Sequence, residues 1–304
     1  MCERLLRASS RTLIAACFGL VVALGPVASG AQHNAVPPVR QIDHIMIRSD
    51  EPRNLYGLFV ETFRLPVAWE MATRGGVASG GVGFGNVNVE TIRFPGQTTT
   101  QSVLVGFALE PHPSLSASLA ELDRRHIPYG APRPFVNRDS HGSVQTLWTN
   151  VTLARLSDSN TPADARMHIF LSEYSPAYVN VDQRRQRLHD ALAGNNGGAL
   201  GVDSVVEVRI GTTDLQEGMQ RWKELLAPSQ EYADGFMPIG SGPAVRLVRA
   251  AKNEMQGFVV AVTSLRKAEV FLRERMLLGT VAGEEITIDS SKIEGLDIRL
   301  IEKK

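Results

Sequence analysis

Apolar and polar residues alternate along this chain in an order that repeats after residue 40: a strand, an amphipathic helix, then further strands. In the first repeat, residues 42–47 alternate as a strand does, and the apolar residues that follow are spaced as on one face of a helix. These residues are Leu55, Leu58, Phe59 and Phe63. Further strands are predicted at residues 67–71, 80–84 and 86–94.

The same order recurs three more times. The strands predicted for these units are 103–109, 133–136, 144–156 and 167–174, then 204–210, 236–239 and 244–248, then 257–263, 285–289 and 296–302. Apolar stripes predict one helix in each unit, directly after its first strand. The segment 105–109 parallels 258–262, and 168–173 parallels 297–302, which predicts a module that has been duplicated twice.

The pattern predicts an α+β protein built from four βαβββ modules, paired into two half-barrel domains with the sheets of each pair facing a cleft. Residues 184–198 are rich in charge, Asn and Gly, and we interpret them as too polar and flexible to form core. The predicted domains are therefore 40–180 and 204–304, joined by a linker at 181–203.

The first 31 residues have the features of a signal peptide. Three arginines precede an apolar run at 13–24, and small residues lead to a cleavage site near Ala31. A membrane anchor and a lipid attachment at Cys17 are the alternatives, but the apolar run is shorter than a spanning helix and continues past Cys17. We expect an exported protein, periplasmic or secreted. Because Cys2 and Cys17 both lie in this segment, the mature chain would contain no cysteine.

Charge excludes some function classes. Without residues 1–31, which hold three arginines and Glu3, 29 basic and 31 acidic residues remain, a net charge near −2. This balance gives no electrostatic case for nucleic acid or for a membrane surface after signal cleavage. The glycine-rich segments 79–83 and 240–243 do not lie between a strand and a helix, so they predict turns rather than nucleotide binding.

Two polar residues on the first unit's strands carry a resemblance to a known family. His44 lies on the first strand, and Glu90 follows Gly85 and Asn86 on the strand that closes the unit. With the module order, this arrangement resembles the vicinal oxygen chelate superfamily, which includes glyoxalase I and the extradiol dioxygenases. The resemblance places one metal-ligand position on the first strand of each module and another on its last strand.

The resemblance therefore implies His44, Glu90 and Glu173 as ligands of a divalent ion, Zn²⁺, Mn²⁺, Fe²⁺ or Ni²⁺, with substrate completing the coordination. Glu173 would also be the catalytic general base. The chain departs from the family pattern on its second module, where Val105, Gly106 and Phe107 stand in place of a histidine. The alternative is that all three predicted ligands are structural or solvated residues.

The second half contains fewer candidate ligands. Glu207 matches the position of His44 and Glu302 matches Glu173, but the strand at 244–248 has no carboxylate to match Glu90. We expect this half to be structural or to bind a small ligand without metal.

Three further residues are predicted to line a substrate pocket: Trp148, Tyr174 and the loop residue His141. Core packing for Trp148 and solvation for His141 are the alternatives. The leading hypothesis is a metal-dependent lyase, isomerase or dioxygenase that acts on a small molecule with adjacent oxygens. The alternative is a metal-free protein that binds a small molecule in the same cleft. The sequence leaves open whether the protein forms a homodimer.

Overall fold

The computed structural model describes residues 36–138, 141–228 and 234–304, and residues 35–304 form one compact unit. The predicted signal peptide lies outside the described residues. No helix among the described residues is long and apolar enough to cross a membrane.

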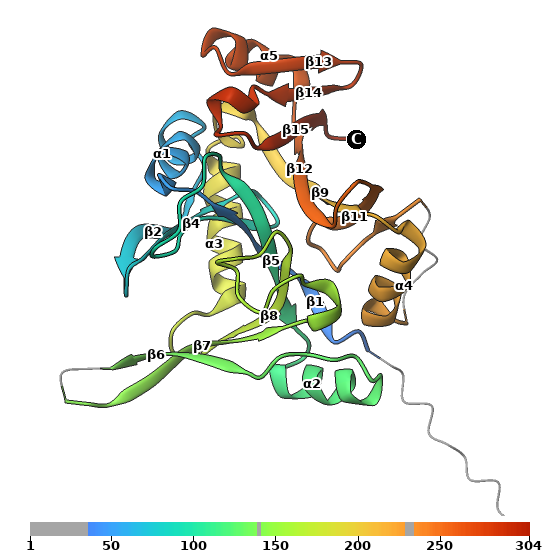
Figure 1. Ribbon diagram of the computed structural model, residues 1–304. Coiled ribbons are helices and arrows are strands. Elements are labelled where there is room, and N and C mark those ends of the chain that lie inside the picture. Colours follow the sequence, from blue (N-terminus) through green and yellow to red (C-terminus); the bar gives the residue numbers. More distant parts are fainter. Residues whose placement is uncertain (1–35, 139–140, 229–233) are drawn as a thin grey trace, which may run out of the picture. The chain divides into compact units, whose positions relative to one another are not determined.

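The first half contains two modules of the predicted order (Figure 1). Module 1 consists of β1 (Val39–Arg48), α1 (Pro52–Gly57), the π-helix η1 (Leu58–Thr62), β2 (Val67–Arg74), β3 (Val77–Gly83) and β4 (Asn88–Arg93). Module 2 consists of β5 (Val103–Pro111), α2 (Leu115–Arg124), β6 (Arg133–Arg138), β7 (Val144–Thr152), the 3-10 turn η2 (Ala154–Leu156) and β8 (His168–Tyr174). In module 1, the apolar stripe predicted a single helix; this helix is an α-helix in its first part, α1, and a π-helix in its second part, η1.

The second half repeats the scheme, except that among the described residues only two strands follow the helix of module 3. Module 3 consists of β9 (Val202–Thr212), α4 (Leu215–Leu226), β10 (Phe236–Met237) and β11 (Ala244–Arg249). Module 4 consists of β12 (Glu254–Val262), α5 (Leu265–Glu274), β13 (Leu278–Ala282), β14 (Glu285–Ile288), η4 (Ser290–Lys292) and β15 (Asp297–Glu302). The predicted α+β architecture of four modules is confirmed.

Each pair of modules forms one sheet. The eight-stranded sheet has the order β2-β3-β4-β1-β5-β8-β7-β6, and the seven-stranded sheet has the order β10-β11-β9-β12-β15-β14-β13. In both sheets the two first strands pair antiparallel at the centre, and each first strand pairs in parallel with the last strand of its own module. This arrangement gives each sheet an internal two-fold repeat.

The two faces of the eight-stranded sheet have different surroundings. One face packs against the helices in the main core, which includes Ile45, Phe59 and Phe107. The opposite face, called the inner face below, carries a separate small cluster of Met46, Val105, Ala108 and Phe170. Because side chains alternate along a strand, the inner face of β1 is also where His44 lies, two residues before Met46.

The segment 181–203 is not a flexible linker, so that interpretation was wrong. Its first part is the helix α3 (Val181–Gly194), capped by the Asn180 side chain, and the 3-10 turn η3 (Gly198–Leu200) follows. Leu188 and Leu192 of α3 are buried, as is Arg184. The apolar residues fall at four-residue spacing within a charged sequence, which suits a helix with one narrow buried face.

Candidate functional site

His44 and Asp43 lie side by side on the inner face because β1 contains a bulge. The pairing with β5 shifts between Ile42 and His44, which leaves Asp43 as an extra residue. Nδ1 of His44 lies 2.7 Å from Oδ2 of Asp43. An ionised carboxylate can only accept a hydrogen bond, so Nδ1 carries the proton. Nε2 of His44 then faces Glu90, whose Oε2 lies 3.6 Å away.

Glu90 is held on the inner face by hydrogen bonds from its neighbours. The Ser79 hydroxyl donates to Oε1 of Glu90, and the indole N–H of Trp69 donates to Oγ of Ser79 at 3.1 Å. Burial raises the pKa of the Glu90 carboxyl, although His44 and the Ser79 hydroxyl partly offset this effect. Trp69 also meets the His44 ring edge to face, with the ring centres 6.0 Å apart.

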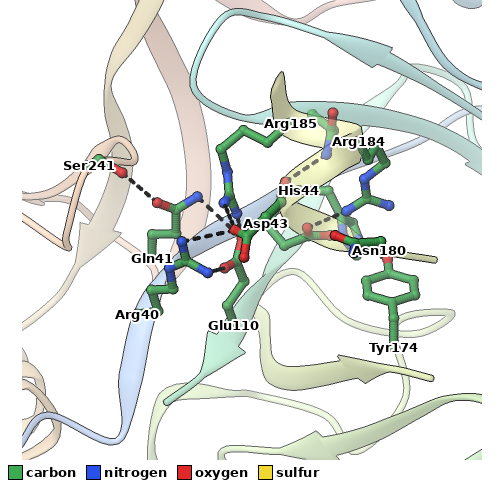
Figure 2. Close-up of polar contacts among 12 residues, drawn as sticks. Arg40, Gln41, Asp43, His44, Glu110, Tyr174, Asn180, Arg184, Arg185 and Ser241 are labelled. Carbon is green, nitrogen blue, oxygen red and sulfur yellow. Dashed lines mark hydrogen bonds and ion pairs between the residues drawn. The ribbon is translucent and has the colours of Figure 1, made fainter. Parts of the chain in front are cut away.

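Arg184 of α3 forms a buried ion pair with Asp43 (Figure 2). Its guanidinium lies 4.9 Å from the ring centre of Tyr174 and 5.9 Å from that of Trp69, and the Tyr174 hydroxyl donates to Asp43 at 3.3 Å. Burial favours the neutral carboxyl, but Arg184 and His44 outweigh it and hold the pKa of Asp43 well below its usual range. Asp43 is therefore an ionised carboxylate at neutral pH.

The structure does not bring Glu173 to His44 and Glu90. The Glu173 carboxylate accepts the backbone N–H of Leu115, at 2.7 Å, at the start of α2. The next residue, Tyr174, points to the inner face and Asp43, as alternation along β8 requires. Glu302 accepts the backbone N–H of Leu265 at the start of α5, at 3.3 Å, so the two matched glutamates hold the same kind of position.

Strand register identifies which residues do correspond to His44 and Glu90. In the first strand of every module, one bulged residue comes directly before the position equivalent to His44. These bulged residues and the positions that follow them are Asp43 and His44, Val105 and Gly106, Val206 and Glu207, and Gln256 and Gly257. Glu90 lies two residues beyond Asn88, the partner of His44 in β4. The residues equivalent to Glu90 in the other modules are found in the same way, two residues beyond the parallel partner of each first-strand position. Gly106 pairs with His168, Glu207 with Ala244 and Gly257 with Asp297, so the equivalent residues are Phe170, Arg246 and Arg299.

The residues present do not fit the expected metal ion. His44 and Glu90 are two ligands, while Gly106 and Phe170 occupy the other two positions and can bind no metal. No group of three His, Cys, Asp or Glu side chains that could hold an ion occurs within 36–138, 141–228 and 234–304. Arg184 also places a fixed positive charge on Asp43, the residue that holds Nδ1 of His44.

The corresponding positions of the seven-stranded sheet hold a network of ion pairs. Glu207 is buried and accepts from Arg209 and Arg246, each at 2.8 Å. Arg299 pairs with Asp297 and Glu285. With arginines at both last-strand positions, this sheet offers a divalent cation no ligand set.

The predicted pocket residues Trp148 and Tyr174 lie together in an aromatic cluster with Phe135 and Tyr178. Trp148 stacks on Phe135 with ring centres 4.9 Å apart, and lies 6.3 Å from Tyr174 and 5.8 Å from Tyr178. Phe135 and Tyr178 are 45% and 41% exposed, respectively. His141, the third predicted residue, lies in the turn between β6 and β7, and is exposed.

Asn150 adds a polar group to this surface. It lies two residues beyond Trp148 on β7 and opposite Ser172 on β8, so it points to the inner face. Its amide oxygen is buried and has no hydrogen-bond partner among the described residues. Such a group costs free energy unless a ligand or water satisfies it.

Comparisons with known proteins were made at three levels. No protein-family model and no curated protein matches the chain. Solved structures do: a hypothetical protein from Staphylococcus aureus has a TM-score of 0.55 at 10% identity, covering 86% of this chain and 99% of that one. A mutant 4-hydroxymandelate synthase from Streptomyces coelicolor has a TM-score of 0.55 at 11% identity, covering 87% and 93%.

A third structure is homoprotocatechuate 2,3-dioxygenase from Brevibacterium fuscum, with a TM-score of 0.54 at 10% identity, covering 90% of this chain and 83% of that one. The chain has the fold of the vicinal oxygen chelate superfamily. At these identities the likeness concerns the fold alone, so function must be argued from the site.

Proposed function

We propose that this chain binds a small organic molecule on the inner face of the eight-stranded sheet, without a metal ion held by His44, Glu90 and Glu173. The observation that carries the proposal is the amide oxygen of Asn150, which is buried, lacks a hydrogen-bond partner among the described residues and lies two residues from Trp148 on the same face. A planar ligand could satisfy this amide while its ring packs against the aromatic cluster.

The neighbouring groups suit recognition of a polar molecule. Tyr174 and Phe170 place aromatic rings on the same face, where Ser172 carries a hydroxyl and the Tyr174 hydroxyl donates to Asp43. The dioxygenase neighbour binds 3,4-dihydroxyphenylacetate, a small aromatic acid. Small aromatic compounds with one or two polar substituents are therefore the ligand class to test first.

A binding screen with substituted variants tests this proposal. Ligand-observed NMR of the full chain would be run with benzoates, phenols and benzamides, and hits would be repeated with Asn150→Leu and Trp148→Ala. We expect both variants to weaken binding about tenfold or more, the effect of losing one buried contact of about 1.4 kcal/mol. Asn54→Leu, an exposed residue of α1, serves as the control. Equal affinity in all four proteins would overturn the assignment.

A metal-dependent enzyme is the second candidate, and one observation favours it. Metal bonds of about 2.1 Å at tetrahedral angles separate two donor atoms by about 3.4 Å, close to the 3.6 Å between His44 and Glu90. Asp43 on Nδ1 is also the partner that metal-binding histidines usually have. About one equivalent of metal in the parent protein, lost in His44→Ala, would favour this candidate.

We also propose that the protein is exported from the cytoplasm. The basic and apolar pattern of residues 1–31 supports it. Mass spectrometry of the protein recovered from the periplasm would show a mature chain that begins near residue 32, whereas a full-length cytoplasmic product would contradict export.

A further inference from the structure

The inner face contains half of a metal site, formed by His44 and Glu90, and a single side chain stands at the nearest remaining position. Phe170 is the residue that strand register sets in correspondence with Glu90. Its ring centre lies 5.9 Å from that of His44 and 5.0 Å from that of His168, so Phe170 contacts both histidines. We propose that Phe170 is the residue that closes this site to divalent metal, and that a ligand at position 170 would open it.

The distances support a third ligand at this position. A metal ion bound to Nε2 at about 2.1 Å lies about 3.2 Å from the centre of the imidazole ring and just under 3 Å from the carbon of a bound carboxylate. A carboxylate within about 6 Å of the His44 ring centre can therefore share an ion with His44, and the Phe170 ring centre meets this limit. A glutamate side chain reaches about as far as the centre of a phenylalanine ring.

The other open position cannot supply the ligand. Gly106 corresponds to His44, but a Cβ atom there would lie 1.8 Å from the carbonyl oxygen of His168, and its φ of +151° disfavours other residues. The backbone thus limits module 2 to one ligand, from β8. Position 170 decides whether the site has two protein ligands or three.

The coordination left by two ligands is weak. Structural and catalytic zinc sites use at least three protein ligands, and each ligand lost costs affinity. Phe170 removes the third ligand and covers the space with an apolar ring, so that an ion at His44 and Glu90 would keep only part of its coordination. This inference goes beyond the proposed ligand binding and does not depend on it.

The test is a gain of metal binding in Phe170→Glu. Full-length parent, Phe170→Glu, Phe170→Leu and the double variant Phe170→Glu with His44→Ala would be dialysed against Mn²⁺ or Zn²⁺ and analysed for metal, with circular dichroism to verify folding. We expect about one equivalent in Phe170→Glu only. Phe170→Leu controls for the loss of the ring.

Two outcomes overturn the proposal. One is about one equivalent in the parent that disappears with His44→Ala, because Phe170 would then not exclude metal. The other is a folded Phe170→Glu protein that binds no more metal than Phe170→Leu. If the buried glutamate prevents folding in the absence of metal, Phe170→His supplies an uncharged third ligand, and the absence of metal in that folded variant counts equally against the proposal.

Discussion

Removing Arg184 should destabilise the protein strongly, since it leaves Asp43 ionised and buried without its partner. Both side chains are less than a tenth exposed. Breaking a buried pair by removing one partner typically costs about 3–5 kcal/mol, and each cation–π contact, here with Tyr174 and Trp69, adds about 0.5–2 kcal/mol. Arg184→Met should therefore lower the free energy of unfolding by at least about 4 kcal/mol.

Urea unfolding followed by circular dichroism measures this loss, and a double-mutant cycle isolates the pair. Asp43→Asn combined with Arg184→Met should be more stable than Arg184→Met alone, because no uncompensated charge remains. Arg187→Met is the matched control, because Arg187 is an exposed arginine of the same helix whose guanidinium donates to the Val67 carbonyl at 3.5 Å. A loss below about 1 kcal/mol in Arg184→Met, or no recovery in the double variant, would refute this account of the pair.

The same pair sets a pH dependence. The folded-state pKa of Asp43 lies below its unfolded value, so its contribution to stability is present above the unfolded pKa of about 4 and is lost as pH falls toward the folded pKa. The stability difference between the parent and the double variant should therefore shrink between about pH 4 and pH 2. A difference that grows on acidification would contradict the sign of this shift.

Three further predictions follow from single contacts. Glu173→Ala and Glu302→Ala should each cost about 0.5–2 kcal/mol in urea unfolding and leave metal content unchanged, because both carboxylates accept a helix N-terminal N–H; a loss of metal in Glu173→Ala but not in Glu302→Ala would restore the predicted ligand role of Glu173. Gly106→Ala should cost about 3 kcal/mol or more, since its Cβ would collide with the His168 carbonyl; near-parental stability would show that β5 and β8 can separate. Burial beside Glu70 raises the pKa of Tyr56 to about 12, so Tyr56→Phe should remove absorbance at 295 nm that develops around pH 12, and an unchanged titration would contradict it.

The fold could be predicted from the sequence because it depends on periodicity. Four repeats of one strand and helix order predicted four modules in two pairs, with the sheets of each pair facing a cleft. The observed element order confirms the modules, and strand pairing joins each pair of modules into one continuous sheet. The predicted alignment of the two halves was less accurate. It made Val105 equivalent to Phe258, whereas the strand pairing makes Gly106 equivalent to Gly257. The error arose because both strands are nearly continuous apolar runs, and such a run does not mark its own register in the hydrophobic pattern.

The site was predicted in part. His44 and Glu90 lie together as expected, and Trp148 contacts Tyr174. Glu173 was predicted because the resemblance places a ligand on the last strand of module 2, but a shift of one residue reverses the face to which a side chain points. Arg184 and Asn150 were missed because neither belongs to a recognisable motif. An arginine at the start of an amphipathic face, in register with Leu188 and Leu192, was the one available signal.

The most direct test of the central claim is the metal content of the purified full chain, measured beside His44→Ala with Glu90→Ala after incubation with Zn²⁺, Mn²⁺, Fe²⁺ or Ni²⁺ and removal of excess ion. The claim predicts the same low content in both proteins, since two ligands next to Arg184 do not make a stable site. About one equivalent in the parent, lost in the double variant, would contradict it.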